Sequence, residues 1–309
     1  MTPQSPRATR ATRATRAPDA RIRAAFDEAG VTGYLHAVDI DADVRDSTTQ
    51  ISVGADTLVA TSSVHKLCLL VTLYRQAADG LLDLTEQIES PGDARTGGPT
   101  GLAAMLDPVR MSLRDLAYLM MSVSDNAAAD LLFQRVGLAA VNDAMTALGL
   151  TRTLATQTVG ELFATIAEDT GQAGVRALAD PQVVARLRAL DPTCTNRGTP
   201  RDMTRLLTAI WRDRACPPEY CAALRRILGL QVWPHRLASG FPFDDVHVSG
   251  KTGSLPTVRN EIGVVEYPDG GRYAVAVFTR AASTAATLPA ADAVIGTAAR
   301  IAVEALRAP

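Results

Sequence analysis

The spacing of apolar residues along the chain changes twice, and each change predicts a different kind of secondary structure. Near the N-terminus, Ile22, Ala25 and Phe26 follow a helical spacing that closes at Gly30. The next segments are typical of strands, over 33–40 and 51–53. From Ser62 onward the apolar positions follow a helical period for a long way, which predicts helices over 66–78, 113–121, 127–136, 139–148, 201–212 and 219–228.

The last third of the chain returns to strand patterns. We expect strands over 246–249, 261–267 and 272–278, a hairpin across 268–271 and a closing helix over 288–306. Strands at both ends with helices between them predict one sheet built from distant parts of the chain. This arrangement predicts a sheet lobe over roughly 19–60 and 240–309, a helical lobe over roughly 61–239, and a cleft between the lobes.

Composition excludes several classes of protein. A length of 309 residues with 47% hydrophobic content is enough to bury a sizeable core. The net charge of -2 offers no electrostatic attraction to nucleic acid or to an acidic membrane surface. We therefore expect a small-molecule partner, no nucleic acid and no membrane. The four cysteines and four histidines lack metal-ligand spacing, so no metal is expected.

The N-terminal segment 1–18 repeats Arg-Ala-Thr and contains no apolar run of the signal-peptide type. We expect a disordered tail, followed by one catalytic domain over 19–309. The protein is then expected to be cytoplasmic, with reduced cysteines, although Cys216 and Cys221 lie close enough in sequence to pair. A mis-assigned start codon that hides an export signal is the alternative.

Lysine is rare in this chain, and its two occurrences stand in short polar motifs. Of the 31 lysines and arginines, only Lys66 and Lys251 are lysines. A buried lysine beside a second cation loses its proton far more readily than an arginine does, and can then act as a base. The two positions are therefore candidates for chemistry rather than for surface charge.

Three motifs surround the lysines: S-x-x-K at Ser63–Lys66, S-D-N at Ser124–Asn126 and K-T-G at Lys251–Gly253. Ser63 and Lys66 are three residues apart at the start of a predicted helix, so they share one helix face, whereas the residue three after Ser62 is His65. We therefore expect Ser63 to be a nucleophile activated by Lys66. The backbone N–H groups of Ser63 and Ser254 are candidates for an oxyanion hole.

In this order, the three motifs resemble those of the class A serine β-lactamases and the penicillin-binding proteins. The resemblance covers about 22–306, including 111–116, 199–203 and 260–265. It implies an α+β fold in which an antiparallel sheet is flanked by the terminal helices and carries an inserted all-helical subdomain. It also implies a serine hydrolase that opens a β-lactam or related amide through an acyl-enzyme, without a cofactor.

The same resemblance suggests roles for the residues around the serine. Ser124 is expected to relay a proton to the leaving group, and Asn126 to hydrogen-bond an amide carbonyl of the substrate. Lys251, Thr252 and Arg259 are expected to bind a substrate carboxylate, and Gly253 and Ser254 belong to the same expected substrate-binding segment.

One region departs from the family pattern. Class A β-lactamases carry an E-x-x-L-N segment whose glutamate activates the water that hydrolyses the acyl-enzyme, and 151–198 contains no such motif. Glu161 lies about where that glutamate is expected, either as the base or as a solvated helix carboxylate. Hydrolysis of the acyl-enzyme is therefore one interpretation of the function. An acyltransferase, an esterase, a slowly deacylating penicillin-binding protein and an idle β-lactam-binding scaffold are the alternatives.

Overall fold

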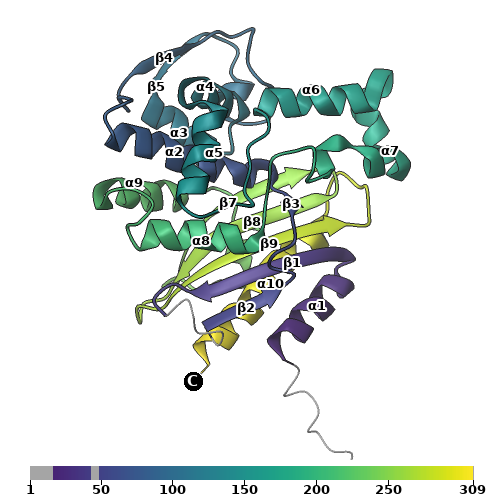
Figure 1. Ribbon diagram of the computed structural model, residues 1–309. Helices are drawn as coiled ribbons and strands as arrows, with labels where there is room; N and C mark the ends of the chain where they lie inside the picture. Colours follow the sequence, from purple (N-terminus) through teal and green to yellow (C-terminus); the bar gives the residue numbers. More distant parts are fainter. Residues whose placement is uncertain (1–16, 43–48, 309) are drawn as a thin grey trace, which may run out of the picture.

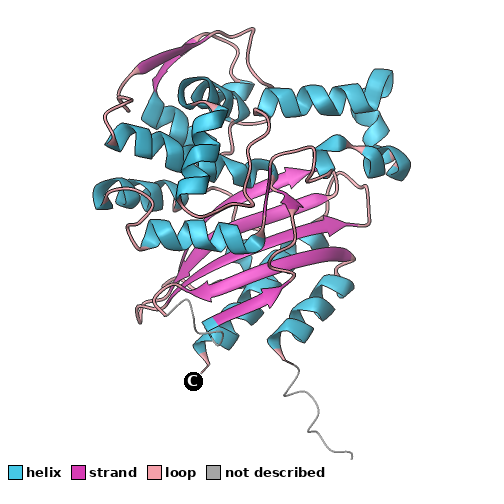
Figure 2. Ribbon diagram, in the orientation of Figure 1, coloured by secondary structure: helices cyan, strands magenta, loops and turns pink. Residues whose placement is uncertain are grey.

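The computed structural model describes residues 17–42 and 49–308, and most of the expected N-terminal tail lies outside these ranges. A five-stranded antiparallel sheet forms the centre of the molecule (Figures 1 and 2), with the strand order β2-β1-β9-β8-β7. The strands are β1 (Val31–Asp39), β2 (Gln50–Val53), β7 (His247–Leu255), β8 (Val258–Glu266) and β9 (Arg272–Ala281). Strand β1 thus pairs with β9 from the far end of the chain and β2 adds to the outer edge of β1, so the sheet joins distant parts of the chain as the sequence pattern predicts.

Helices cover both faces of this sheet. The terminal helices α1 (Pro18–Glu28) and α10 (Pro289–Arg307) lie on one face (Figure 1), where they bury Ile22, Phe26 and Ile295 against Leu35 and Val277. Helix α8 (Pro200–Trp211) packs on the opposite face, together with the helical region. The sheet is therefore apolar on both sides, and the strand sequences are correspondingly rich in valine and alanine.

The helical region is built around a buried helix. Helix α2 (Lys66–Ala78) has no exposed residue from Lys66 to Tyr74. It begins directly after a short 3-10 turn, η2 (Ser62–His65). The helices packed around it are α3 (Leu113–Ser122), α4 (Asn126–Val136), α5 (Leu138–Ala147) and α9 (Pro218–Leu228).

A second group of helices lies between α5 and α8. It contains α6 (Val159–Thr170) and α7 (Pro181–Arg186), with the 3-10 turns η4 (Gly171–Ala179) and η5 (Arg188–Leu190). These elements form a small apolar core of their own with Leu255 and Val258 of the sheet. The 3-10 turns η3 (Gly101–Ala104) and η6 (Leu237–Gly240) complete the short helices among the described residues.

The α+β fold expected from the sequence is confirmed, with three differences in detail. Strand β7 continues to Leu255, so K-T-G lies inside the strand rather than at its end; small polar residues hide the strand signal, while the ladder to β8 continues through Ser254 and Arg259. The S-x-x-K serine lies in a 3-10 turn before the α-helix. Two short ribbons, β3 (Val59–Ala60) with β6 (Arg197–Gly198) and β4 (Gln87–Ser90) with β5 (Val109–Ser112), are absent from the sequence prediction because pairs this short carry little periodicity.

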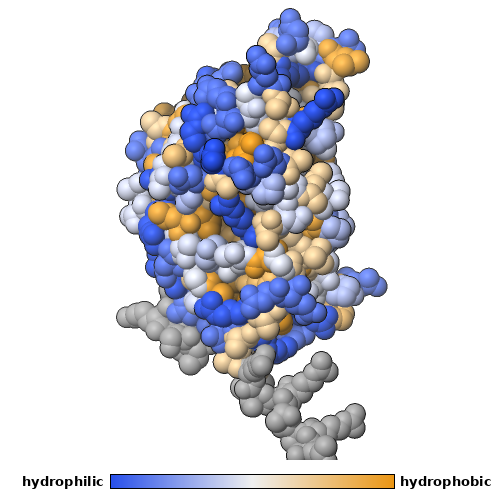
Figure 3. Space-filling model, turned by 90° about the vertical axis from the view of Figure 1, so that its right-hand side faces the viewer, coloured by the Kyte–Doolittle hydropathy of each residue, from blue (hydrophilic) through white to orange (hydrophobic). Residues whose placement is uncertain are grey.

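The described surface is mixed in character. On the face that Figure 3 shows, hydrophobic residues form scattered patches among hydrophilic ones rather than one continuous apolar area. In the part of the chain that the structure describes, no helix is both long enough and apolar enough to cross a membrane. All four cysteines are free thiols, and the Sγ atoms of Cys216 and Cys221 lie 3.4 Å apart.

Candidate active site

The three motifs meet at the junction of the sheet and the helical region. Ser63 from η2, Asn126 from the start of α4 and Ser254 from β7 line one small cavity of about 90 Å³, together with Lys66 and Asn196. The Ser63 side chain is half-buried, and its hydroxyl makes no hydrogen bond with any other described residue. The hydroxyl is therefore available to a molecule that enters the cavity.

The turn that carries Ser63 is held in a strained conformation against strand β7. Ser62, just before it, has φ +48°, a left-handed conformation that non-glycine residues rarely adopt. A side chain at Gly253 would collide with Ser62 Oγ and the Thr61 carbonyl, so glycine permits the close approach of the strand. Asn260 Nδ2 donates to the carbonyl of Ala60 at 3.0 Å and stabilises the turn from β8. Such local strain is concentrated at functional sites.

Lys66 is buried in a cage of oxygen atoms. Its Nζ donates to the Ser124 carbonyl at 2.7 Å, to Asn126 Oδ1 at 2.8 Å and to the Asp125 carbonyl at 3.3 Å. Burial lowers the pKa of Lys66 to about 7, although the carboxylates of Asp125 and Asp130 oppose this shift. At neutral pH the amine is thus divided between its charged and neutral forms, which suits a group that must accept a proton.

Lys251 lies on the other side of the Ser124 hydroxyl. Its Nζ donates to Ser124 Oγ at 2.9 Å and to the Thr252 carbonyl at 2.8 Å, while Lys66 Nζ lies 3.4 Å from the same Ser124 oxygen. Burial and the nearby charge of Lys66 hold the pKa of Lys251 well below its usual range. Ser124, with φ +59°, is therefore a bridge between two mutually repelling amines.

The buried carboxyl group of Glu261 is connected to strand β7 through hydrogen bonds. Glu261 Oε1 accepts from Gln231 Nε2 at 2.7 Å, and Gln231 Oε1 accepts from the Thr252 backbone N–H at 2.6 Å. The other oxygen of Glu261 accepts from the Leu237 N–H at 2.7 Å. Burial raises the pKa of Glu261 to about 7. This chain of hydrogen bonds fixes the strand segment beside Lys251.

Two arginines lie near Ser254, in different roles. Arg236 is buried and donates to Ser254 Oγ at 2.7 Å and to the Gly253 carbonyl at 3.0 Å, with its Nε paired to Asp292. The guanidinium of Arg259 donates to backbone carbonyls, among them that of Val258 at 2.9 Å. Arg236 therefore binds the K-T-G strand segment directly, while the donors of Arg259 are engaged by the carbonyls of Leu255, Val258 and Ala286 and its Nε lies 3.5 Å from Asp292.

Helix α6 forms an apolar wall of the cavity. Asp130 of α4 anchors the first turn of α6. The two carboxylate oxygens of Asp130 accept from the N–H groups of Val159 and Gly160, each at 2.8 Å. Val159, Leu162 and Phe163 then face the cavity that Ser63 lines. Of the carboxylates in the described ranges, none lines this cavity.

Glu161 is directed away from the serine by its own helix. Its carboxylate accepts from the Thr158 N–H at 2.7 Å, and Thr158 Oγ1 in turn accepts from the Glu161 N–H, which is a capping box. The side chain is exposed at the start of α6. The structure brings Ser63, Lys66, Ser124, Asn126 and Lys251 together and leaves Glu161 outside the group.

His65, the third residue of the S-x-x-K motif, lies beneath the same cavity without a hydrogen-bond partner. Its side chain is 2% exposed, and neither ring nitrogen has a partner in the described part of the chain. Burial lowers its pKa to about 4, so the ring is neutral at pH 7. An unpaired buried polar group costs about 1–3 kcal/mol of stability, and this cost is incurred two residues from Ser63.

Comparison with known proteins assigns the family. The sequence model of the β-lactamase enzyme family matches residues 17–306. The chain belongs to this family. Among its relatives, the β-lactamase regulatory protein BlaB of Streptomyces cacaoi is 34% identical over 300 residues, which cover 90% of this chain and 94% of that protein.

Solved structures of the β-lactamase family have the same fold. The β-lactamase of Sphaerobacter thermophilus matches with a TM-score of 0.75 at 27% identity, covering 94% of this chain and 97% of that one. PBP-A matches with a TM-score of 0.73 at 20% identity, covering 92% and 93%, a likeness in fold alone. The family resemblance and the fold predicted from the motifs are thus confirmed.

Several residues of this β-lactamase-family site were missed in the sequence analysis. Arg236, Gln231 and Asn196 lie in loops with no periodic pattern, and only the fold brings them to the site. Glu261 did offer a signal, because a carboxylate within an apolar strand must be paired or neutral when buried. Among the described residues, no group of three or more His, Cys, Asp or Glu side chains is arranged to hold a metal ion.

Proposed function

We propose that Ser63 attacks the carbonyl carbon of a β-lactam or a related amide and forms an acyl-enzyme. The observation that carries this proposal is the hydrogen-bonded arrangement of Lys66, Ser124 and Lys251 around the turn of Ser63. A serine hydroxyl needs an adjacent base to become a nucleophile. Lys66, whose pKa is lowered to about 7 by burial, supplies that base in the same cavity.

In the proposed reaction, protons pass along a short series of neighbouring groups, from the Ser63 hydroxyl to the leaving nitrogen. Lys66 Nζ takes the proton of the Ser63 hydroxyl as the new C–O bond forms. The C–N bond of the substrate then breaks, and the Ser124 hydroxyl gives its proton to the leaving nitrogen. Ser124 recovers a proton from Lys66 or Lys251, both of which donate to its oxygen. The backbone N–H groups of Ser63 and Ser254 stabilise the oxyanion.

A substrate carboxylate is proposed to bind along strand β7. Lys251, Thr252 and Ser254 supply an amine and two hydroxyls on that strand, with Gly253 allowing the strand to approach the serine. Buried Arg236 donates to Ser254 Oγ and adds a positive charge next to this segment of the strand. We assign no carboxylate contact to Arg259, because its guanidinium already donates to backbone carbonyls. Asn126 is proposed to contact an amide group of the substrate.

We further propose that the acyl-enzyme is released slowly. Hydrolysis requires a base that activates water beside the ester, and the α6 wall of the cavity consists of Val159, Leu162 and Phe163. Glu161 is occupied in its capping box. A long-lived adduct suits a protein that reports the presence of a β-lactam, and the related BlaB is a β-lactamase regulatory protein.

The test is to mix the protein with a chromogenic cephalosporin and a fluorescent penicillin, and to follow ring opening and intact mass together. We expect one covalent adduct per chain that persists after excess penicillin is removed. Ser63→Ala abolishes the adduct, whereas Ser62→Ala, a matched change at the neighbouring serine, retains it. Labelling of Ser63→Ala to the level of the parent protein would refute the assignment of the nucleophile.

Rapid turnover is the second candidate function, and it has a distinct signature. If the adduct disappears within seconds while the cephalosporin continues to open, the protein is a β-lactamase, and Glu161→Gln then tests the carboxylate in the first turn of α6. An adduct that is discharged only after an amine or alcohol is added identifies an acyltransferase or esterase. A protein that forms no adduct with either reagent contradicts acylation by β-lactams.

A further inference from the structure

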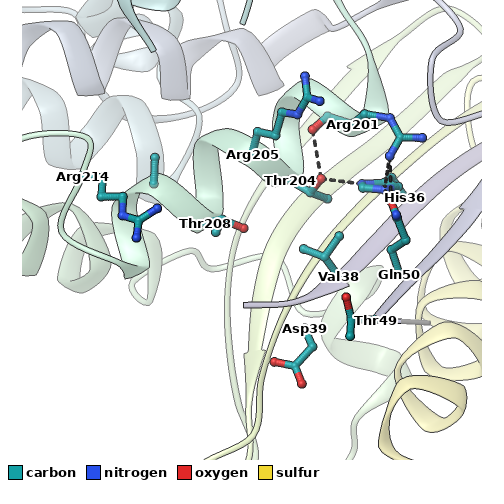
Figure 4. Close-up of a pocket in the computed structure, with 11 residues that line it drawn as sticks. His36, Val38, Asp39, Thr49, Gln50, Arg201, Thr204, Arg205, Thr208 and Arg214 are labelled. Atoms are coloured by element: carbon teal, nitrogen blue, oxygen red, sulfur yellow. Dashed lines mark hydrogen bonds between the residues drawn. The ribbon is translucent and has the colours of Figure 1, made fainter. Parts of the chain in front are cut away.

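A second and larger cavity lies on the opposite side of helix α8 from the strand that carries K-T-G. It has a volume of about 360 Å³ and is lined by β1, Thr49, β2, α8 and Arg214 (Figure 4). Pockets for small organic ligands begin at about 300 Å³. None of the residues that line this cavity lines the cavity of Ser63, so any ligand here occupies a separate site.

One wall of this cavity is a rigid polar network around His36. The Thr204 hydroxyl donates to the Arg201 carbonyl at 3.0 Å, so it accepts the proton of His36 Nδ1 at 2.6 Å. The lone pair of His36 Nε2 then accepts from Arg201 Nη1 at 2.9 Å, and Gln50 Oε1, which lies 3.0 Å from the same ring nitrogen, accepts from Arg201 Nη1 at 2.8 Å. Burial lowers the pKa of His36 to about 4, and the ring is neutral. Arg201 thus links His36 and Gln50, and its charge is balanced by Asp56 at 2.8 Å.

Two other polar groups at the cavity lack partners. Thr208 Oγ1 is buried and makes no hydrogen bond with any described residue, although a helical threonine usually bonds the carbonyl four residues earlier. The Arg214 guanidinium makes no side-chain hydrogen bond or ion pair within residues 17–42 and 49–308. Figure 4 shows Thr208 between Arg214 on one side and the His36–Arg201 pair on the other. Donors therefore remain unused along one edge of the cavity.

The charge of the lining selects the ligand class. Among the described residues, the lining holds three arginines, at positions 201, 205 and 214, and one carboxylate, Asp39. Arg201 is paired with Asp56, and Arg205 lies 3.7 Å from Asp202, so Arg214 is the lining arginine without an acidic partner in the described part of the chain. Val38 and Ala209 supply apolar surface between the charges. We propose that this cavity binds a small organic anion, whose carboxylate or phosphate pairs with Arg214 and Thr208 and whose body contacts Val38.

The test is isothermal titration calorimetry of the full chain at low ionic strength, with benzoate and with phenyl phosphate. These probes share one apolar body and differ in head group, so the tighter of the two identifies the anion. We expect saturable binding of one molecule per chain. Arg214→Gln weakens the binding about tenfold or more, because it removes a charge-assisted hydrogen bond, and Thr208→Val weakens it in the same direction.

Two control variants distinguish binding in this cavity from nonspecific electrostatic binding and from the chemistry of Ser63. Arg176→Gln removes an exposed arginine that lies outside the cavity, and it leaves the affinity unchanged. Ser63→Ala also binds as the parent protein does, so the proposal is independent of the acylation chemistry. Equal weakening by Arg176→Gln and Arg214→Gln, or no saturable binding of either probe, would overturn the proposal.

Discussion

The lowered pKa of Lys66 makes a quantitative prediction about the pH dependence of acylation. If the amine must be neutral to accept the Ser63 proton, the acylation rate follows its neutral fraction. With a pKa of about 7, that fraction rises from about 9% at pH 6 to about 91% at pH 8, a roughly tenfold increase that then levels off. An ordinary lysine, titrating near pH 10.4, gives about a hundredfold increase over the same range with no plateau.

The assay is the second-order rate constant for labelling by a fluorescent penicillin, measured between pH 5.5 and 9 by rapid quenching. Lys66→Arg is the matched control, because arginine keeps a positive charge at every pH used. We expect it to acylate about 10²- to 10⁴-fold more slowly, without the step near pH 7. A parent rate that climbs tenfold per pH unit through pH 8, or a Lys66→Arg variant that acylates normally, refutes Lys66 as the base.

Three further predictions follow from the packing of the site. Gly253→Ala forces strand β7 away from the serine turn, so acylation falls by about tenfold or more while the secondary structure seen by circular dichroism is retained; unchanged labelling contradicts this steric argument. Leu162→Glu places a carboxylate in the cavity and shortens the lifetime of the adduct, whereas Leu162→Gln does not, as deacylation followed by intact mass shows; equal lifetimes in both variants argue against a missing base. His65→Phe removes an unpaired imidazole and stabilises the fold at pH 7 by about 1–3 kcal/mol in urea unfolding. Because the pKa of His65 is lowered to about 4 from 6.5, the unfolded chain takes up its proton first, and parent stability falls as pH drops from 6.5 to 4. In the variant, the unfolding free energy no longer changes with pH through His65, while His36 retains its own contribution of the same sign. An unchanged pH dependence of stability contradicts the assignment of this effect to His65.

The local sequence was sufficient to predict the candidate reacting groups. Serine and lysine three residues apart on one turn are neighbours in any helical conformation, so their proximity depends on no distant contact. The scarcity of lysine directed attention to Lys66 and Lys251. The alternation and helical periods likewise located every strand of the main sheet and the helices around α2, because these elements bury one face or both.

The tertiary structure alone decided which groups share a cavity. Glu161 and Leu162 are adjacent in sequence, yet the capping box turns the carboxylate outward and the anchoring of α6 by Asp130 turns the leucine inward. The unpaired ring of His65 and the second cavity beside α8 also arise from packing between segments more than a hundred residues apart. Periodicity reports which face of an element is buried, but not what it is buried against, and that contact determines whether a carboxylate activates water or caps a helix.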